Sequence, residues 1–152
     1  MKALITGMSG TGKSTVLAAL AARGYRTADT DYDDLTVWDE SAEEWLWDEP
    51  RIDALLSAPD PLFLSGTTRN QLRFYPRLDH VILLSAPAPV IVRRLETRTS
   101  NPYGKTPEER DLVLHHLATV EPLLRRGASL EVVTTIPIAE VVTRILTHCG
   151  LQ

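Results

Sequence analysis

The 152-residue chain has 43% hydrophobic and 24% charged residues, a composition typical of a globular protein of one domain. Its formal net charge is −4 and no block of Lys or Arg stands out, which disfavours an extended nucleic-acid interface. The single cysteine, Cys149, excludes an internal disulfide, and no apolar run is long enough to predict a membrane span. Since Met1 and Lys2 run into a predicted strand without a signal peptide, we expect a cytoplasmic protein.

Along the chain, short apolar runs alternate with segments of helical period. The predicted strands are residues 2–6, 25–29, 61–66, 80–85 and 130–135. The predicted helices are residues 13–23, most of 35–57, 88–98, 106–127 and 137–148. In the long helix, Thr106 and Glu109 fit a capping box, Pro122 should kink or split the helix, and Gly127 should end it. Five strands joined by helical crossovers predict an open, mostly parallel α/β sheet without a linker that would divide the chain.

The first strand and helix enclose the clearest motif, because residues 7–14 read GMSGTGKS. This spacing, G-x-x-x-x-G-K-[ST] between strand and helix, is that of a phosphate-binding loop. Its glycines let backbone amides surround phosphate, Lys13 adds a positive charge for the β- and γ-phosphates, and the Ser14 hydroxyl suits Mg²⁺. The flanking elements disfavour an accidental match, so we expect ATP or another nucleoside triphosphate with Mg²⁺. The expected contacts are Gly7, Met8, Ser9, Gly10, Thr11, Gly12, Lys13, Ser14 and Thr15.

Carboxylates follow the second predicted strand in the stretch ADTDYDDL. Because the carboxyl ends of neighbouring parallel strands face one crevice, Asp29 and Asp31 should face the phosphate loop. There a carboxylate can hold Mg²⁺ through water, or orient an attacking hydroxyl and accept its proton. Asp33 and Asp34 extend the cluster, although helix capping is the more ordinary use for them.

These motifs together resemble the small P-loop kinases: shikimate kinase, gluconate kinase and the wider nucleoside monophosphate kinase group. The resemblance rests on the loop at residues 7–14, the D-x-D of Asp29 and Asp31, and the short chain. It implies a three-layer P-loop fold with strand order 2-3-1-4-5, helices on both faces and a short lid. It also implies that Asp29 lies near Mg²⁺, together with Ser14, and that Asp31 holds the hydroxyls of the acceptor.

The third strand ends in LFLSGTTRNQ, where adenylate-type kinases have Asp-Gly followed by an arginine. Ser65 and Gly66 stand in place of that Asp-Gly, so the resemblance leaves the metal to Ser14 and Asp29. It places Arg69 on an anionic group of the acceptor, for which a guanidinium fork is well suited. A solvated loop arginine is the alternative, and Asn70 and Gln71 are weaker candidates.

The stretch RRLETRTSNPYGK, residues 93–105, resembles the start of the lid in the same kinases, and the expected lid is residues 94–106. The resemblance assigns Arg94 to stacking on adenine and Arg98 to the transferring phosphoryl group, and Lys105 could also reach phosphate. The alternative is a basic helix end that is favoured by the helix dipole. In the turn after the last predicted strand, the resemblance places Thr135, Ile136 and Pro137 beside adenine.

The three tryptophans lie in the segment between the second and third strands, residues 35–60, which forms the acceptor-binding insertion in these families. Trp38 and Trp45 are seven residues apart and would share one face of a helix. Trp38 could stack on a planar acceptor, whereas packing of a small cap is the commoner use of such spacing. His115 and His116 have no partner at zinc-binding spacing, so they are expected to cover a helix face.

Two functions are compatible with these residues. The first is a small-molecule kinase, a phosphotransferase that moves the γ-phosphoryl group of ATP·Mg²⁺ to a hydroxyl or phosphate of a metabolite, nucleoside or nucleotide. Its expected catalytic residues are Lys13, Asp29, Asp31 and Arg98. The second is a P-loop ATPase or a nucleotide-dependent regulator without an acceptor. The D-x-D, the insertion and the arginine-bearing lid favour the kinase, and we expect a monomer or a simple homodimer without nucleic-acid or membrane partners.

Overall fold

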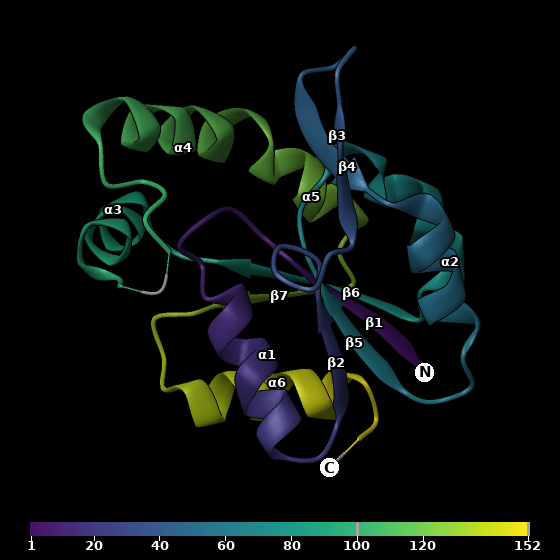
Figure 1. Ribbon diagram of the computed structural model, residues 1–152. Helices are drawn as coiled ribbons and strands as arrows, with labels where there is room; N and C mark the ends of the chain where they lie inside the picture. The colour runs from purple at the N-terminus through teal and green to yellow at the C-terminus, as the bar shows by residue number, and fades with distance from the viewer. Residues whose placement is uncertain (100, 152) are drawn as a thin grey trace.

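The computed structural model describes residues 1–99 and 101–151, and its centre is a five-stranded parallel sheet (Figure 1). The strands are β1 (Lys2–Thr6), β2 (Arg26–Asp29), β5 (Leu62–Ser65), β6 (His80–Ser85) and β7 (Leu130–Val133). Their order across the sheet is β2-β5-β1-β6-β7. Counted along the chain without the separate β3-β4 pair, this is the order 2-3-1-4-5, so the predicted P-loop topology is confirmed.

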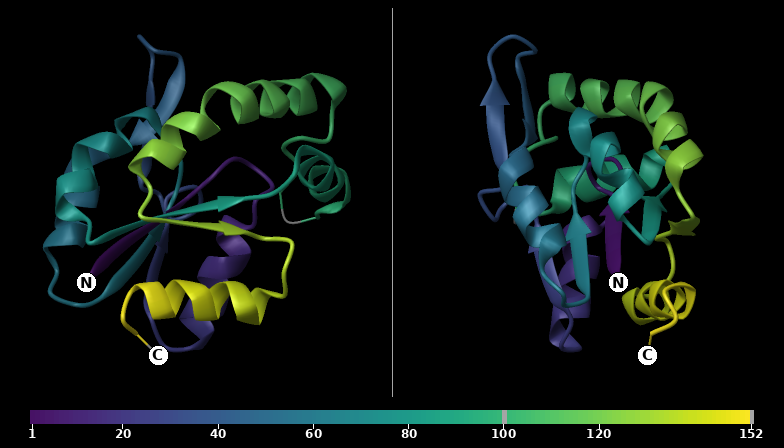
Figure 2. Two further views of the ribbon diagram at one scale, coloured as in Figure 1. Left: turned by 180° about the vertical axis from the view of Figure 1, so that it is seen from behind. Right: turned by 90° about the vertical axis from the view of Figure 1, so that its right-hand side faces the viewer.

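Helices cover both faces of the sheet, as the three-layer prediction requires. They are α1 (Lys13–Ala22), α2 (Glu49–Ser57), a 3₁₀ segment (Arg69–Arg77), α3 (Ala88–Thr97), α4 (Pro107–Thr119), α5 (Glu121–Gly127) and α6 (Ile138–His148). Helices α1 and α6 lie side by side on one face of the sheet (Figure 1 and Figure 2). They pack on Ile5, Phe63 and Ile82. On the other face, α2 packs on Leu4 and Leu64, because successive side chains of a strand point to opposite faces. Among the described residues, no helix is both long enough and apolar enough to cross a membrane.

The long helix predicted over residues 106–127 is split where Pro122 requires it. Helix α4 ends at Thr119, and Pro122 occupies the first turn of α5, where a missing N–H costs nothing. The Thr106 hydroxyl accepts from the N–H of Glu109 at 3.2 Å, so Thr106 caps α4 as predicted. The expected capping box does not close, because the Glu109 carboxylate accepts from the N–H of Gly104, at 3.2 Å.

The prediction that residues 35–57 are mostly helical was wrong for their first half. Residues Thr36–Asp39 (β3) and Glu44–Trp47 (β4) form an antiparallel hairpin, and α2 begins only at Glu49. Trp38 and Trp45 are therefore a cross-strand pair, with ring centroids 5.6 Å apart, and do not share a helix face. Figure 2 shows the hairpin projecting beyond the sheet.

Trp47 and Asn70 fix this hairpin to the end of β5. Trp47 is buried and its indole N–H donates to the hydroxyl of Thr30 at 3.1 Å. The Asn70 side chain accepts from the N–H of Trp47 and donates to its carbonyl, both at 3.0 Å, as a neighbouring strand would. Asn70 thus has a structural role, and the hairpin is held above the carboxyl edge of the sheet.

Candidate active site

The phosphate loop lies between β1 and α1, and the side chain of Lys13 folds back onto the backbone of the loop. The Lys13 ammonium donates to the carbonyl of Gly7 at 2.7 Å and to that of Met8 at 3.2 Å. Gly12 precedes α1 with φ +100°, and a Cβ there would meet no atom within 4 Å. The start of α1 is therefore open toward solvent, in the arrangement that leaves backbone amides available to phosphate oxygens.

Lys13 has negative charges near it but no ion pair with a carboxylate among the described residues. Desolvation lowers the pKa of Lys13, while the charges of Asp31 and Asp29 raise it and that of Arg98 lowers it. A half-buried ammonium that is held only by two carbonyls is a good binding partner for an anion that enters the loop.

Asp29 joins the end of β2 to the first turn of α1. Its Oδ2 accepts from the Ser14 hydroxyl at 2.7 Å, and its Oδ1 accepts from the N–H of Asp31 at 3.1 Å. In the parallel register Asp29 lies opposite Ser65 of β5. Strand β2 therefore supplies a carboxylate beside the site where β5 has none, and Ser14 and Asp29 together form a pair of oxygen donors that suits Mg²⁺.

Asp31 faces the same cleft from the loop after β2. Protein around its carboxyl group desolvates it and raises its pKa, Lys13 lowers that pKa, and Asp29 raises it further. Asp33 accepts from the N–H of Asp29 at 2.7 Å, and Asp34 pairs with Arg51 outside the cleft. Asp31 is thus the free carboxylate of this loop, whereas Asp33 and Asp34 have structural partners.

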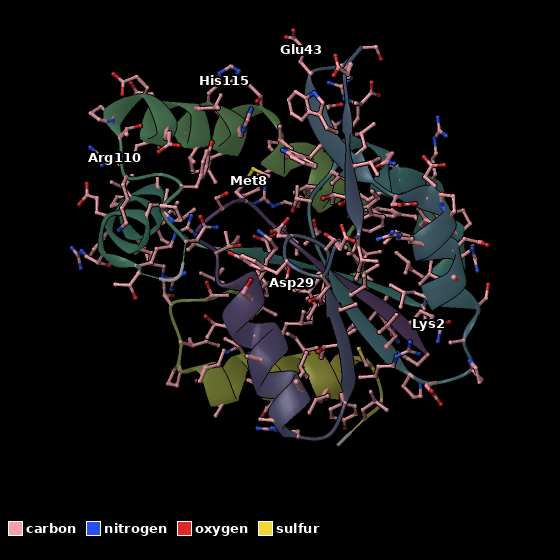
Figure 3. The ribbon with its side chains drawn as sticks, in the orientation of Figure 1. Lys2, Met8, Asp29, Glu43, Arg110 and His115 are labelled. Atoms are coloured by element: carbon pink, nitrogen blue, oxygen red, sulfur yellow. The ribbon has the colours of Figure 1, made fainter. Side chains whose placement is uncertain are left out.

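Two pockets meet at these groups. One of about 290 Å³ is lined by the phosphate loop, Asp31, Tyr32, Arg94 and Arg98, and a neighbouring one of about 180 Å³ is lined by Met8, Thr67, Tyr103 and His116. Ser9, Lys13 and Asp31 line both. Of the four predicted catalytic residues, Lys13 and Asp31 therefore line both spaces, Arg98 lines only the first, and Asp29 lines neither. The two spaces lie near the centre of the molecule, where Figure 3 labels Met8 and Asp29.

Arg94 connects the phosphate loop with the turn after β7. Its guanidinium donates to the carbonyl of Gly10 at 3.1 Å and to the Thr134 hydroxyl and carbonyl at 2.9 and 2.7 Å. A third pocket of about 230 Å³ lies along this turn and is lined by Arg94, Thr134, Ile136 and Ile138. Thr135 and Pro137, which were expected beside adenine, are exposed and do not line it.

Arg98 is bonded to the segment that was predicted as a lid. Its guanidinium lines the pocket of Lys13 and donates to the carbonyls of Asn101 and Tyr103 at 3.1 and 2.7 Å. Asn101 in turn donates to the Tyr32 hydroxyl at 2.9 Å, so the lid touches the loop after β2. Lys105 donates to the carbonyl of Glu96 at 3.0 Å, at the end of α3, and does not line the cleft.

The predicted acceptor residues lie in different places. Arg69 is exposed and forms an ion pair with Glu44 of β4 at 3.1 Å. Trp45 and Arg69 line an apolar pocket beside Met8, whereas Trp38 lines only a shallow surface on the hairpin. The pairing of Trp38 with Trp45 thus puts the second ring, rather than the first, toward the site.

Sequence reasoning did not single out several residues of the site. The Thr67 hydroxyl accepts from the N–H of Gly7 at 3.2 Å and donates to its carbonyl at 2.7 Å, so it braces the phosphate loop. Thr134 does the same from the other side, by donating to the carbonyl of Thr11 at 2.7 Å. Both threonines follow the carboxyl end of a strand of the parallel sheet, since Thr67 comes after β5 and Thr134 directly after β7, and these strand ends border the cleft.

Comparison with known families and structures supports this description. A family model described as an AAA domain matches residues 4–115. The chain belongs to the AAA domain family. The comparison of this AAA domain with curated proteins found no match.

Among solved structures, similar ones include shikimate kinase from Acinetobacter baumannii in complex with shikimate, with a TM-score of 0.72 and 20% identity over 98% of this chain and 92% of that one. Shikimate kinase from Bacteroides thetaiotaomicron gives 0.74 and 18% over 99% of both chains. A gluconokinase from Sinorhizobium meliloti 1021 gives 0.68 and 23% over 98% and 91%. At these identities the likeness shows the fold, and the resemblance to the small P-loop kinase group is confirmed for this AAA domain at that level.

Proposed function

We propose that the protein is a small-molecule kinase that transfers the γ-phosphoryl group of ATP to a hydroxyl or phosphate group of a small acceptor. The observation that carries this proposal is the position of Lys13 and Asp31, which line two adjoining pockets at once. A protein that only hydrolyses or senses ATP needs one pocket, for the nucleotide. A transferase needs a second space for the acceptor on the far side of the reacting groups.

The donor site is the phosphate loop with its two flanking pockets. Backbone amides of residues 7–15 would surround the phosphates, and the turn that Arg94 ties to Thr134 would border the base. Adenine would then contact Ile136 and Arg94, with Thr135 and Pro137 at the rim. Ser14 and Asp29 would hold Mg²⁺, which supplies positive charge to the phosphate oxygens when it is bound.

The transfer step can be written on the side chains present. The acceptor hydroxyl oxygen attacks the γ-phosphorus, the bond from that phosphorus to the oxygen of ADP breaks, and the acceptor proton passes to the Asp31 carboxylate. Lys13 and Arg98 stabilise the negative charge on the transferring group, and Asp29 orients Ser14. Because desolvation raises the pKa of Asp31, its carboxylate is a stronger base than an ordinary aspartate.

Two segments complete the proposal. Residues 94–106 act as a lid that excludes water, through the contacts of Arg98 and of Asn101 with Tyr32. Residues 35–60 serve as the acceptor-binding insertion, with Arg69 at its edge. The chain then acts as one domain, as a monomer or a simple homodimer, in the cytoplasm.

The test is the release of ADP from ATP·Mg²⁺ with and without a panel of nucleosides, nucleotides, sugars and hydroxy acids. A kinase releases ADP faster with its acceptor than alone. Equal rates across the panel contradict transfer to those acceptors, and they favour the alternative, a P-loop ATPase or a nucleotide-dependent regulator.

A further inference from the structure

A fourth pocket lies next to the pocket of Lys13 and Asp31, and its lining is mainly apolar rather than polar. It has a volume of about 400 Å³, within the range of small-molecule sites. Its walls are mainly apolar and come from the phosphate loop, the hairpin, the 3₁₀ segment and α5. They include Met8, Trp45, Leu72, Val120, Leu123 and Leu124.

This apolar pocket is continuous with the pocket of Lys13 and Asp31. Met8, Thr67 and His116 line both spaces. A molecule that lies against Trp45 can therefore extend past Met8 and Thr67 toward the carboxylate of Asp31. The apolar pocket is thus placed to hold the body of an acceptor rather than an unrelated ligand.

The pocket offers no unpaired charge among the described residues that line it. Its charged side chains, Glu44 and Arg69, form an ion pair with each other at 3.1 Å. An acceptor carboxylate or phosphate that reached Arg69 would lie close to the like charge of Glu44, which repels it. This pair disfavours an anionic acceptor, contrary to the role that the sequence suggested for Arg69.

Oε1 of Glu44 is buried without a hydrogen bond among the described residues, whereas three other polar side chains of the pocket are bonded within the protein. Gln71 donates to Thr6 and Tyr75 and accepts from the N–H of Thr68. The hydroxyl of Thr68 donates to Asn70, and that of Thr67 is shared with Gly7. A polyhydroxylated acceptor would find few free hydrogen-bond partners here, so its hydroxyls would lose water without replacement.

Three large apolar side chains around the pocket are exposed to solvent. Trp45 is 60% exposed, Leu72 63% and Leu123 57%. A ring or hydrocarbon body placed among them removes apolar surface from water on both partners, and the indole of Trp45 offers a face for stacking.

We propose that the acceptor is a neutral alcohol with an apolar, ring-bearing body. The inference rests on the proposed kinase function, and it narrows that function to one acceptor class. The body lies between Trp45, Leu72 and Leu123, and the hydroxyl points past Thr67 to Asp31. Shikimate and gluconate, which are anionic polyols, belong to a different class.

The first experiment compares benzyl alcohol and cinnamyl alcohol with shikimate, gluconate and glycerol, as acceptors in ADP release and as ligands in calorimetric titration of the ADP-bound protein. The aromatic alcohols should stimulate ADP release and bind more tightly than the other three compounds. Stimulation or tighter binding by shikimate or gluconate would overturn the inference while the kinase function stands. Absence of binding by the aromatic alcohols would also overturn it.

Matched tryptophan variants separate the pocket from the hairpin. Trp45→Ala and Trp38→Ala each remove one ring of the same cross-strand pair, but only Trp45 lines the apolar pocket. Trp45→Ala should weaken binding of cinnamyl alcohol about tenfold or more, and Trp38→Ala should change it by about twofold or less. Equal effects of the two variants would contradict a contact with Trp45.

Matched leucine variants provide a second control that leaves the hairpin intact. Leu123→Asn and Leu112→Asn both alter exposed leucines, and only Leu123 lines the pocket. Leu123→Asn should weaken binding of the alcohol, whereas Leu112→Asn should not. If the alcohol binds in this Trp45- and Leu123-dependent way without stimulating ADP release, the inference that it is an acceptor is overturned, whereas the kinase function is decided by the wider acceptor panel.

Discussion

The hydroxyl of Ser14 donates to Oδ2 of Asp29 at 2.7 Å, and this bond joins the start of α1 to the end of β2. Asp29 lies beside Ser65 of β5, where no carboxylate is available to assist a metal. We therefore propose that these two oxygens are the protein's contribution to a Mg²⁺ site in this cleft.

Asp29→Asn should weaken Mg²⁺-dependent binding of ATP about tenfold or more, because it removes the charge that holds Ser14 and the metal. The measurement is titration with a fluorescent ATP analogue, with and without Mg²⁺. Binding without the metal should change little. Asp34→Asn is the matched control, because it makes the same change at a residue that pairs with Arg51 outside the cleft. If both variants bind ATP·Mg²⁺ as the wild type does, Asp29 has no part in metal binding.

Lys13→Met should lower the rate of phosphoryl transfer by about 10²–10³-fold, since it removes a positive charge aimed at the transferring group. It should not lower the melting temperature. Desolvation already lowers the pKa of Lys13, and methionine fills a similar volume without a charge. Lys105→Met is the control, because Lys105 binds the end of α3 and should leave the rate near that of the wild type. A slow enzyme that is also unfolded would not support the catalytic role.

Gly66→Ala should destabilise the fold by about 1–3 kcal/mol, because the new methyl group would overlap the hydroxyl of Thr30 and lie 3.1 Å from the indole nitrogen of Trp47. Those two groups hold the hairpin by their hydrogen bond. Gly24→Ala is the control, with positive φ but no atom within 4 Å of its Cβ. Urea unfolding measures both variants, and a loss of stability at position 66 no larger than that at position 24 would refute the overlap.

The Cys149 thiol should resist alkylation at neutral pH, because desolvation, with a smaller effect of Asp79, raises its pKa to about 11. The thiol therefore contributes stability that is complete below its ordinary pKa of 9.0 and is lost as the pH rises toward about 11. Rates of iodoacetamide labelling against pH, for the native and urea-unfolded protein, measure both values. A native profile centred near 9.0 would contradict the burial of this thiol.

The fold and the donor site could be predicted because their signals are local. The loop at residues 7–14 has a fixed spacing between a strand and a helix, and the central strands are continuous buried runs. The hairpin was missed because a separation of seven residues between Trp38 and Trp45 fits one helix face as well as a cross-strand pair. Its decisive features are the Asp39 side chain, which accepts from Ser41 and Ala42, and the positive φ of Glu43 at the tip.

The acceptor side was harder to predict because its contacts are distant along the chain. Arg69 is neutralised by Glu44, which only the hairpin brings near it. Arg98 donates to the backbone carbonyls of Asn101 and Tyr103. Because every residue has a backbone carbonyl, the sequence does not indicate such a contact. Leu123 of α5 and Trp45 of β4 line one pocket although they are 78 residues apart in the sequence, and neither the split of the long helix at Pro122 nor the hairpin can be read from residue spacing alone.

The central claim is that the γ-phosphoryl group of ATP is moved to a second molecule at Lys13 and Asp31. The direct measurement is mass spectrometry of acceptors after incubation with ATP in which the γ-phosphoryl oxygens are ¹⁸O-labelled, with Lys13→Met as the blank. The account predicts a labelled phosphate ester of an acceptor with the wild type and none with the variant. Labelled inorganic phosphate as the sole product, at the same rate with every acceptor, would contradict it.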